Sequence, residues 1–381
     1  MANPHDRGSE RTNSARSTGE RRREAPDPLR GRSMRLILAA GTTETALVDG
    51  ISAAGATPEL MAHTPPGDAE LLVYGEPVRS PVTPISPTGC VTPAAVTRAV
   101  REVRAFPVTT IDAGLAAPTA APTVTLDAKP GADIRDERAV PDADGLFERA
   151  RSFGASLPDD AITIGETIPG GTTTALGVLT ALGERVGVSS SLPANPMEQK
   201  RSVVRDGLEA SGIEAGECES APLAAIEAVG DPVQATVAGV AAGALEAGID
   251  VTLAGGTQQL AIAAVLRHAG VTGPLTVATT SFVAADRGED IERAADRFDC
   301  ELTVTDPGFD ERDHVTMNRY CAGEVKEGVA MGGALSLVPT DDLAAVRDRF
   351  AAICDRLGVD EFLDGAEPES APDPSVSSEG R

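Results

Sequence analysis

Residues 161–177 read AITIGETIPGGTTTALG, and this stretch decides the fold class. The apolar run Ala161–Ile164 has the length and the β-branched content of a buried strand. It enters a Gly-Gly turn, and the threonines after the turn lead into an amphipathic segment typical of a helix. The same order of short apolar run, turn and amphipathic segment recurs along the chain. This alternation predicts βαβ units, and therefore a parallel sheet covered by helices on both faces.

The predicted fold is α/β, with a doubly wound, mostly parallel sheet flanked by helices, a small helical appendage and disordered termini. The strands are predicted at Leu36–Ala40, Leu71–Tyr74, Val108–Ile111, Ala161–Ile164, Val251–Ala254, Leu275–Thr279 and Leu302–Thr305. The helices are predicted at Thr43–Ala54, Pro93–Arg104, Thr173–Glu184, Pro196–Ser211, Asp231–Gly248, Gln258–His268 and Asp286–Phe298. The segment Pro77–Pro93 holds five prolines and is predicted to be an extended connection.

The two ends of the chain differ in composition from its middle. Residues 1–33 are polar and Arg-rich without periodicity, and residues 360–381 are acidic and contain Pro and Ser. Both ends are therefore predicted to be disordered. Residues 34–359 are predicted to form one α/β domain, with the glycine-rich motifs in its 151–340 part and a divergent 34–150 part.

The chain is strongly acidic. Its 381 residues include 58 acidic and 33 basic side chains, for a formal net charge of −25 at pH 7. This charge argues against binding to nucleic acid or to an anionic membrane surface. Only Lys129, Lys200 and Lys326 are lysines, and a lysine-poor, acid-rich surface fits a salt-rich cytoplasm better than an acidic binding surface. No apolar run reaches the ~20 residues of a membrane span, so we expect a soluble, cytoplasmic protein.

Cysteine and histidine are sparse. The five cysteines include no Cys-x-x-Cys pair, and the four histidines include no His-x-x-x-His pair. The pattern predicts reduced thiols without a disulfide framework, and it predicts no metal site and no cofactor.

The turn at 170–174 has the composition of a phosphate-binding loop. Gly170 and Gly171 allow an anion to approach the backbone closely, and Thr172, Thr173 and Thr174 add hydroxyl donors at the start of a helix. The loop lacks the Gly-Lys-Thr/Ser ending of a Walker loop and the Gly-x-Gly-x-x-Gly dinucleotide fingerprint. The alternative interpretation is a glycine-rich turn that binds no ligand.

Three other features point to the same edge of the sheet. A second turn, Gly255-Gly256-Thr257, follows a predicted strand, and by itself it is at least as well explained as a tight turn with a helix cap. Glu324 and Glu327 lie beside glycines and small apolar residues, where desolvation can raise the pKa of a carboxyl toward the range of a general base. A solvent-facing acidic pair is the simpler interpretation of those two. Lys200, early in a helix, could reach an anionic substrate or could lie on a solvated face.

In combination, these motifs resemble the nicotinate-nucleotide–dimethylbenzimidazole phosphoribosyltransferase family, and its archaeal branch in particular. The match runs from about Ile162 to Val338 with agreement in order and spacing. It comprises the 165–175 loop, Lys200-Arg201, the 221–230 stretch, the 251–257 strand and turn, Lys326-Glu327-Gly328 and the 333–338 stretch.

The resemblance implies an activity and residue roles. Family enzymes transfer the ribose phosphate of nicotinate mononucleotide to a benzimidazole base, which yields α-ribazole phosphate and nicotinate. Glu327 matches their general base, with Glu324 as the fallback. The 170–174 loop matches their phosphate-binding loop, and Glu166 lies near the ribose or the base. The resemblance also implies a homodimer, and it places nucleotide binding in the 151–340 part.

This sequence departs from the family pattern at two turns. Gly171 stands where the family usually has asparagine, and Ala254 stands where it commonly has aspartate. Two other functions stay open: a non-catalytic nucleotide-binding homologue, or an enzyme acting on another phosphorylated nucleoside or small molecule. A kinase is disfavoured because the Walker lysine is missing.

Overall fold

The computed structural model describes residues 31–52, 58–86 and 88–365. Its strands are β1 (Met34–Ala40), β2 (Val108–Asp112), β3 (Thr123–Thr125), β4 (Ala161–Thr167), β5 (Asp250–Ala254), β6 (Leu275–Thr280) and β7 (Glu301–Thr305). Its α-helices are α1 (Pro58–Met61), α2 (Thr64–Tyr74), α3 (Pro93–Val103), α4 (Ala143–Ala155), α5 (Gly171–Ala181), α6 (Met197–Ser211), α7 (Pro222–Val229), α8 (Pro232–Glu246), α9 (Thr257–His268), α10 (Ser281–Arg297), α11 (Val315–Cys321), α12 (Met331–Ser336), α13 (Leu343–Arg356) and α14 (Val359–Gly365). Short 3-10 helices are η1 (Glu44–Leu47), η2 (Phe309–Glu311) and η3 (Thr340–Asp342).

The seven strands form one sheet in the order β3-β2-β1-β4-β5-β6-β7, and every pair of neighbours is parallel. The order reverses between β1 and β4, whose ends are level because Ala40 pairs with Thr167. In doubly wound sheets, ligands bind beyond the carboxyl ends of the strands at this reversal. The predicted fold class is confirmed.

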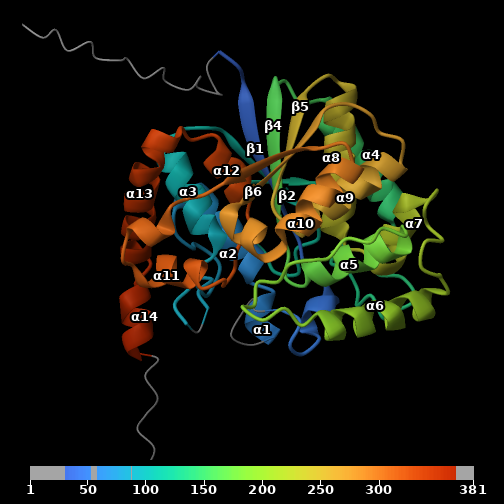
Figure 1. Ribbon diagram of the computed structural model, residues 1–381, viewed down its shortest axis with the longest axis horizontal. Helices are drawn as coiled ribbons and strands as arrows, with labels where there is room; N and C mark the ends of the chain where they lie inside the picture. The colour runs from blue at the N-terminus through green and yellow to red at the C-terminus, as the bar shows by residue number, and fades with distance from the viewer. Residues whose placement is uncertain (1–30, 53–57, 87, 366–381) are drawn as a thin grey trace, which may run out of the picture.

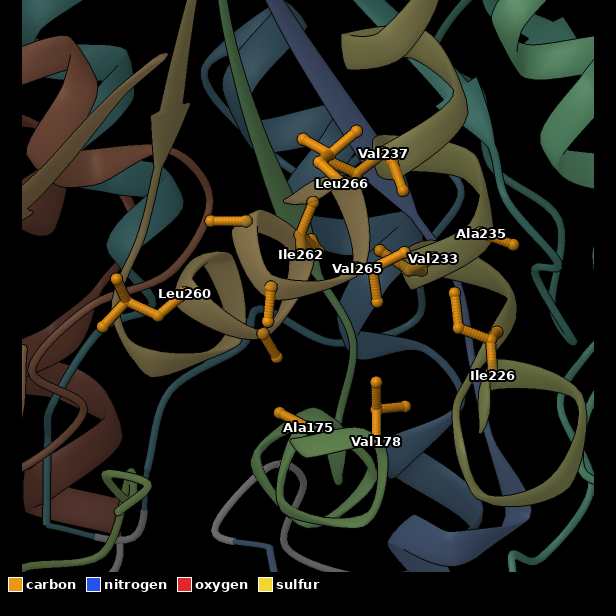
Figure 2. Packing of buried hydrophobic residues seen from close by; sticks show 14 of the residues in the cluster. Ala175, Val178, Ile226, Val233, Ala235, Val237, Leu260, Ile262, Val265 and Leu266 are labelled. Atoms are coloured by element: carbon orange, nitrogen blue, oxygen red, sulfur yellow. The ribbon is translucent and has the colours of Figure 1, made fainter. Parts of the chain in front are cut away.

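Helices cover both faces of the sheet (Figure 1). Alternate side chains of β1 enter different layers, as expected of a strand. Ile37 and Ala39 belong to an apolar cluster with α4, α5, α7, α8 and α9. Leu36 and Leu38 belong to a second cluster with α2, α3, α12 and α13. Figure 2 shows labelled side chains of α5, α7, α8 and α9 converging in the first layer.

Six of the seven predicted strands are confirmed, and one is wrong. The run Leu71–Tyr74 is the last turn of α2, in which residues 65–72 are all buried. A short apolar run buried on all sides has no periodicity that separates helix from strand. The three-residue edge strand β3 was not predicted. The predicted helix Thr43–Ala54 is only the short 3-10 helix η1, and residues 53 and 54 lie outside the described part.

The ends of the chain are ordered slightly beyond the predicted limits. Residues 1–30 and 366–381 lie outside the described residues. Within the predicted N-terminal tail, the Arg32 guanidinium pairs with Asp250 at 2.5 Å, and Ser33 binds the Asp160 carboxylate. Helix α14 extends six residues into the predicted acidic tail. No helix in the described residues is both long and apolar enough to cross a membrane.

The close packing of α4 against α8 depends on glycine. A Cβ on Gly243 would lie 1.9 Å from the carbonyl oxygen of Arg151 and 2.8 Å from the amide nitrogen of Ala155. We expect Gly243→Ala to lower the free energy of unfolding by about 1–3 kcal/mol, because two backbones must separate. Gly288→Ala is the control, since a Cβ there meets nothing within 4 Å. Chemical denaturation in high salt measures both variants, and equal stability would contradict the packing argument.

Candidate functional site

A cleft of about 470 Å³ opens at the carboxyl ends of the central strands. Its lining comes from the loop after β4, the start of α9, and residues 325–329. The opposite wall comes from residues 82–86, 90–93 and α14. The volume lies in the range of small-molecule sites, and the position is that expected from the strand order. The cleft therefore brings together motifs that are more than 150 residues apart in the sequence.

The first turn of α5 lies in this cleft. Gly170 precedes the helix with φ of 80°, and no side chain caps the helix start. Gly170, Gly171 and Thr172 line the cleft. The arrangement offers main-chain N–H groups and the positive end of the helix dipole to an anion.

Two of the predicted phosphate-binding threonines do not face the cleft. The side chains of Thr173 and Thr174 are fully buried. The Thr174 hydroxyl donates to the carboxylate of Asp231 instead. The prediction was wrong for these two side chains, because consecutive residues on a helix point about 100° apart and only one of three can face a ligand at the helix start.

Lys200 lies directly behind this helix start. Its ammonium group donates to the Thr172 hydroxyl at 2.9 Å and to the Ser189 carbonyl at 2.8 Å. The side chain is fully buried, so the interpretation as a solvated helix face is wrong. Burial lowers the pKa of Lys200 to about 8, with a further contribution from nearby Arg287. A positive charge is thus held against the hydroxyl of Thr172.

Glu166 is the last but one residue of β4 and is 3% exposed. Its Oε2 atom accepts a hydrogen bond from the side-chain amide of Gln259. Burial is the main cause that raises the pKa of Glu166 to about 8, and repulsion by Glu327 adds to it. Of the second turn, Gly256 and Thr257 line the cleft. A Cβ on Gly255 would lie 3.2 Å from the Glu166 carboxylate, so this glycine leaves room for the acid.

Glu327 also lines the cleft. Its Oε1 atom accepts from the amides of Gly332 at 2.9 Å and Gly328 at 3.2 Å. Among the described residues its Oε2 atom has no hydrogen-bond partner of normal geometry, although the nearby Thr279 hydroxyl favours the charged form. Removal from water outweighs these interactions and raises the pKa of Glu327 to about 7. A carboxylate with this pKa can accept a proton near neutral pH.

The backbone around Glu327 is strained. Val325 and Lys326 have positive φ values of 61° and 60°. The main-chain amide of Lys326 donates to the carbonyl of Glu324 at 2.6 Å. The main-chain amide of Glu327 donates to the carbonyl of Val325 at 2.7 Å. These two consecutive γ-turns belong to a rare, strained class, at a cost of roughly 1–3 kcal/mol each. Such strain persists only where surrounding contacts impose it, as they do at functional sites.

Lys326 supplies those contacts. Its side chain is 5% exposed, and its ammonium group donates to the carbonyls of Ser190 at 2.8 Å and Leu192 at 3.0 Å. The Thr280 hydroxyl donates to the Lys326 carbonyl at 2.8 Å. Lys326 therefore fixes the Glu327 turn to the 189–192 segment of the cleft wall.

Glu324 lies outside the cleft lining. Its carboxylate accepts from the hydroxyls of Thr88 and, at 3.4 Å, Ser86, and Arg319 lies 3.8 Å away. Glu324 thus holds the 86–88 loop, and its prediction as the fallback base is wrong. The γ-turns rotate the chain between the two glutamates, so that only Glu327 faces the cleft.

The chain has relatives that it matches over most of their length. It is 58% identical to the UPF0284 protein of Halobacterium salinarum over 84% of this chain and 97% of the relative. It is 40% identical to the UPF0284 protein of Methanothermobacter thermautotrophicus over 84% of this chain and 92% of the relative. The chain belongs to the UPF0284 family. No protein-family model matches it.

Solved structures share the fold of this UPF0284 protein. The nicotinate-nucleotide–dimethylbenzimidazole phosphoribosyltransferase of Thermus thermophilus superposes with a TM-score of 0.52 at 15% identity, covering 85% of this chain and 83% of that one. A structure of CobT from the same organism gives a TM-score of 0.54 at 16% identity, covering 86% and 85%. The likeness at this identity concerns the fold, and it agrees with the resemblance predicted from the motifs.

Sequence reasoning missed Asp68. This α2 residue lines the cleft and is 2% exposed. Its carboxylate accepts from the hydroxyls of Thr92 and Thr167, each at 2.6 Å. Burial raises the pKa of Asp68 to about 6 in spite of these bonds. The pattern around Asp68 carried no motif, and the wrong strand prediction at Leu71–Tyr74 hid its position on a helix.

Gln258 was also missed. It lines the cleft, and a Cβ on Gly171 would lie 1.9 Å from its Oε1 atom. The glycine that departs from the family pattern therefore makes room for a polar side chain arriving from α9. Local sequence does not reveal this contact, because Gly171 and Gln258 lie on different βα turns.

Ionisation of Glu166 should weaken the fold. A carboxyl whose folded pKa lies above its unfolded value makes stability fall as the pH rises between the two values, here from about 4.5 to about 8. Between about pH 5.5 and pH 8 we expect the wild-type unfolding free energy to fall by about 3 kcal/mol relative to Glu166→Gln. Denaturation curves at several pH values measure this, and parallel pH dependence of the two proteins would contradict it.

Proposed function

We propose that this UPF0284 protein transfers the phosphoribosyl group of nicotinate mononucleotide to a benzimidazole-type base, with α-ribazole phosphate and nicotinate as products. The observation that carries the proposal is the presence of an uncapped helix start and a raised-pKa carboxylate in one cleft. The fold shared with a solved phosphoribosyltransferase supports it.

The proposed reaction needs the phosphate-binding turn at Gly170–Thr172 and the Glu327 carboxylate at a fixed separation. The 5′-phosphate binds the N–H groups at Gly170–Thr172, beside the buried ammonium of Lys200. This contact places C1′ of the ribose toward Glu327. When the nucleotide and the base are both bound in the cleft, they react from fixed positions and no longer have to meet in solution. This positioning is a large part of such catalysis.

The chemical step is a displacement at C1′. One nitrogen of the azole attacks C1′, and the bond from C1′ to the nicotinate nitrogen breaks. The electron pair of that bond returns to the pyridine ring and neutralises its positive charge. The Glu327 carboxylate accepts the proton from the other azole nitrogen. Glu166, buried and protonated below about pH 8, adds no second negative charge beside that carboxylate.

The direct test is an assay of the purified protein in high salt with nicotinate mononucleotide and dimethylbenzimidazole. We expect release of nicotinate and formation of a ribosylated base. Absence of nicotinate release with any of several azole or purine bases would contradict the proposal. Calorimetric binding of the mononucleotide without any effect of a base would instead favour the non-catalytic homologue.

A further inference from the structure

The cleft joins the two helical layers of the molecule. Helix α5, which carries the phosphate-binding turn, packs in the layer with α7, α8 and α9. The opposite wall, with Ile85, Cys90 and Leu363, packs in the other layer. Figure 1 shows α14 beyond the end of α13, beside α11. The wall that faces the phosphate side is therefore built from residues 82–86, Cys90, residues 92 and 93, and Phe362 of α14.

Aromatic side chains are rare in this chain, and nearly all of them make packing or hydrogen-bond contacts outside the cleft. The sequence has eight phenylalanines, two tyrosines and no tryptophan, and all ten aromatic residues lie in the described part. Phe282, Phe309, Tyr320 and Phe350 pack on one another, and Tyr74 donates its hydroxyl to the Ala120 carbonyl. The others packed in the apolar clusters are Phe106, Phe147, Phe153 and Phe298.

Phe362 is the exception. It is 41% exposed and is the one aromatic residue in the cleft lining. A phenylalanine that is 41% exposed forfeits part of the about 1.5–3 kcal/mol that full burial gives, so a ring left open in the lining of a ligand cleft points to a partner that covers it. The lining of the same cleft includes the apolar residues Leu60, Val82 and Ile85, which offer no charge to a ligand.

The ring is held by its helix. Val359 is 2% exposed and Leu363 packs in the apolar cluster, so the i and i+4 positions of α14 fix it to the molecule. The Leu363 side chain would lie 3.0 Å from a Cβ on Gly89, which shows how closely α14 meets the 88–90 loop. Phe362 lies between the two anchors in sequence and turns to the cleft.

We propose that Phe362 is the stacking platform for the acceptor base, and that helix α14 thereby determines which planar bases are accepted. This inference rests on the proposed phosphoribosyl transfer. A planar, weakly polar heteroaromatic ring matches an aromatic face with apolar neighbours, whereas a sugar or an aliphatic acceptor would gain little from it.

The experiment compares wild type with Phe362→Ala and Phe362→Leu, and uses Val304→Ala as the control at another exposed apolar residue. We expect Phe362→Ala to raise KM for dimethylbenzimidazole at least about tenfold while KM for nicotinate mononucleotide changes less than about twofold. Phe362→Leu keeps apolar area without the ring and should recover only part of the loss. Val304→Ala should match wild type, and thermal midpoints should agree among all four.

Two outcomes would overturn the inference. These are equal base KM values for wild type and Phe362→Ala, or a Phe362→Leu variant as good as wild type. Calorimetric titration of dimethylbenzimidazole separates this failure from failure of the proposed function. If wild type releases no nicotinate, the transfer is wrong, yet base binding that weakens at least about tenfold in Phe362→Ala still supports the platform. No base binding by wild type would reject the platform as well.

Discussion

Replacement of Glu327 by glutamine should lower kcat by about 10²–10⁴-fold and leave the dissociation constant of nicotinate mononucleotide nearly unchanged. The amide keeps the size of the side chain and can still accept from the amides of Gly328 and Gly332. It cannot take the proton of the attacking base. Single-turnover measurements of nicotinate release, with calorimetric titration of the nucleotide, separate the two effects.

Glu324→Gln is the matched control three residues away. Because Glu324 binds the 86–88 loop and does not line the cleft, its replacement should change kcat far less than that of Glu327. Equal losses in the two variants would mean that the turn, and not the Glu327 carboxylate, matters. Unchanged turnover in Glu327→Gln would remove this residue from the mechanism.

The pH dependence of kcat/KM tests the role of Glu327 independently. Glu327 acts as a base only when ionised, so kcat/KM should rise with pH through about 7. Lys200 loses its charge as the pH rises through about 8, so nucleotide binding should weaken above that value. The profile should therefore be bell-shaped, and Lys200→Met should flatten its alkaline limb. A profile that is flat from pH 6 to pH 9 would contradict both assignments.

Lys200→Met should raise KM for nicotinate mononucleotide by about 10–100-fold, the usual effect of losing a charge-assisted hydrogen bond. The ammonium group positions the Thr172 hydroxyl and adds positive charge at the start of α5. Methionine retains most of the buried volume. The KM for the base should stay within a few-fold, because that ligand contacts the opposite wall.

Lys129→Met is the control for Lys200→Met. Lys129 is exposed, so its loss removes the same charge from the molecule without touching the cleft. If both variants bind the nucleotide equally well, the charge at Lys200 has no part in binding. A Lys200→Met variant that fails to fold is recognised by its denaturation curve, and Thr172→Val then tests the same contact through its other partner.

The fold and one side of the site were predictable from local sequence. The 161–177 stretch combines a strand, a turn and a helix start, and each is specified by neighbouring residues. The scarcity of lysine singled out Lys200 and Lys326 in the sequence, and the structure buries both of them. Their partners were not predictable, since Ser189 and Ser190 lie in a segment without periodicity.

The other side of the site depends on contacts between distant segments. Burial raises the pKa of Asp68 against the opposing effect of the hydrogen bonds from Thr92 and Thr167, and no local pattern encodes this burial. Phe362 lies where the composition predicted a disordered acidic tail, because two apolar anchors in seven residues are too few to outweigh the surrounding acids. Tertiary contacts decide both positions.

The most direct measurement is a crystal structure of the protein with bound nicotinate mononucleotide. We expect the 5′-phosphate within hydrogen-bonding distance of the main-chain N–H groups at 170–172, with C1′ turned toward the carboxylate of Glu327. A nucleotide bound outside this cleft, or bound in it with the phosphate away from the start of α5, would contradict the account.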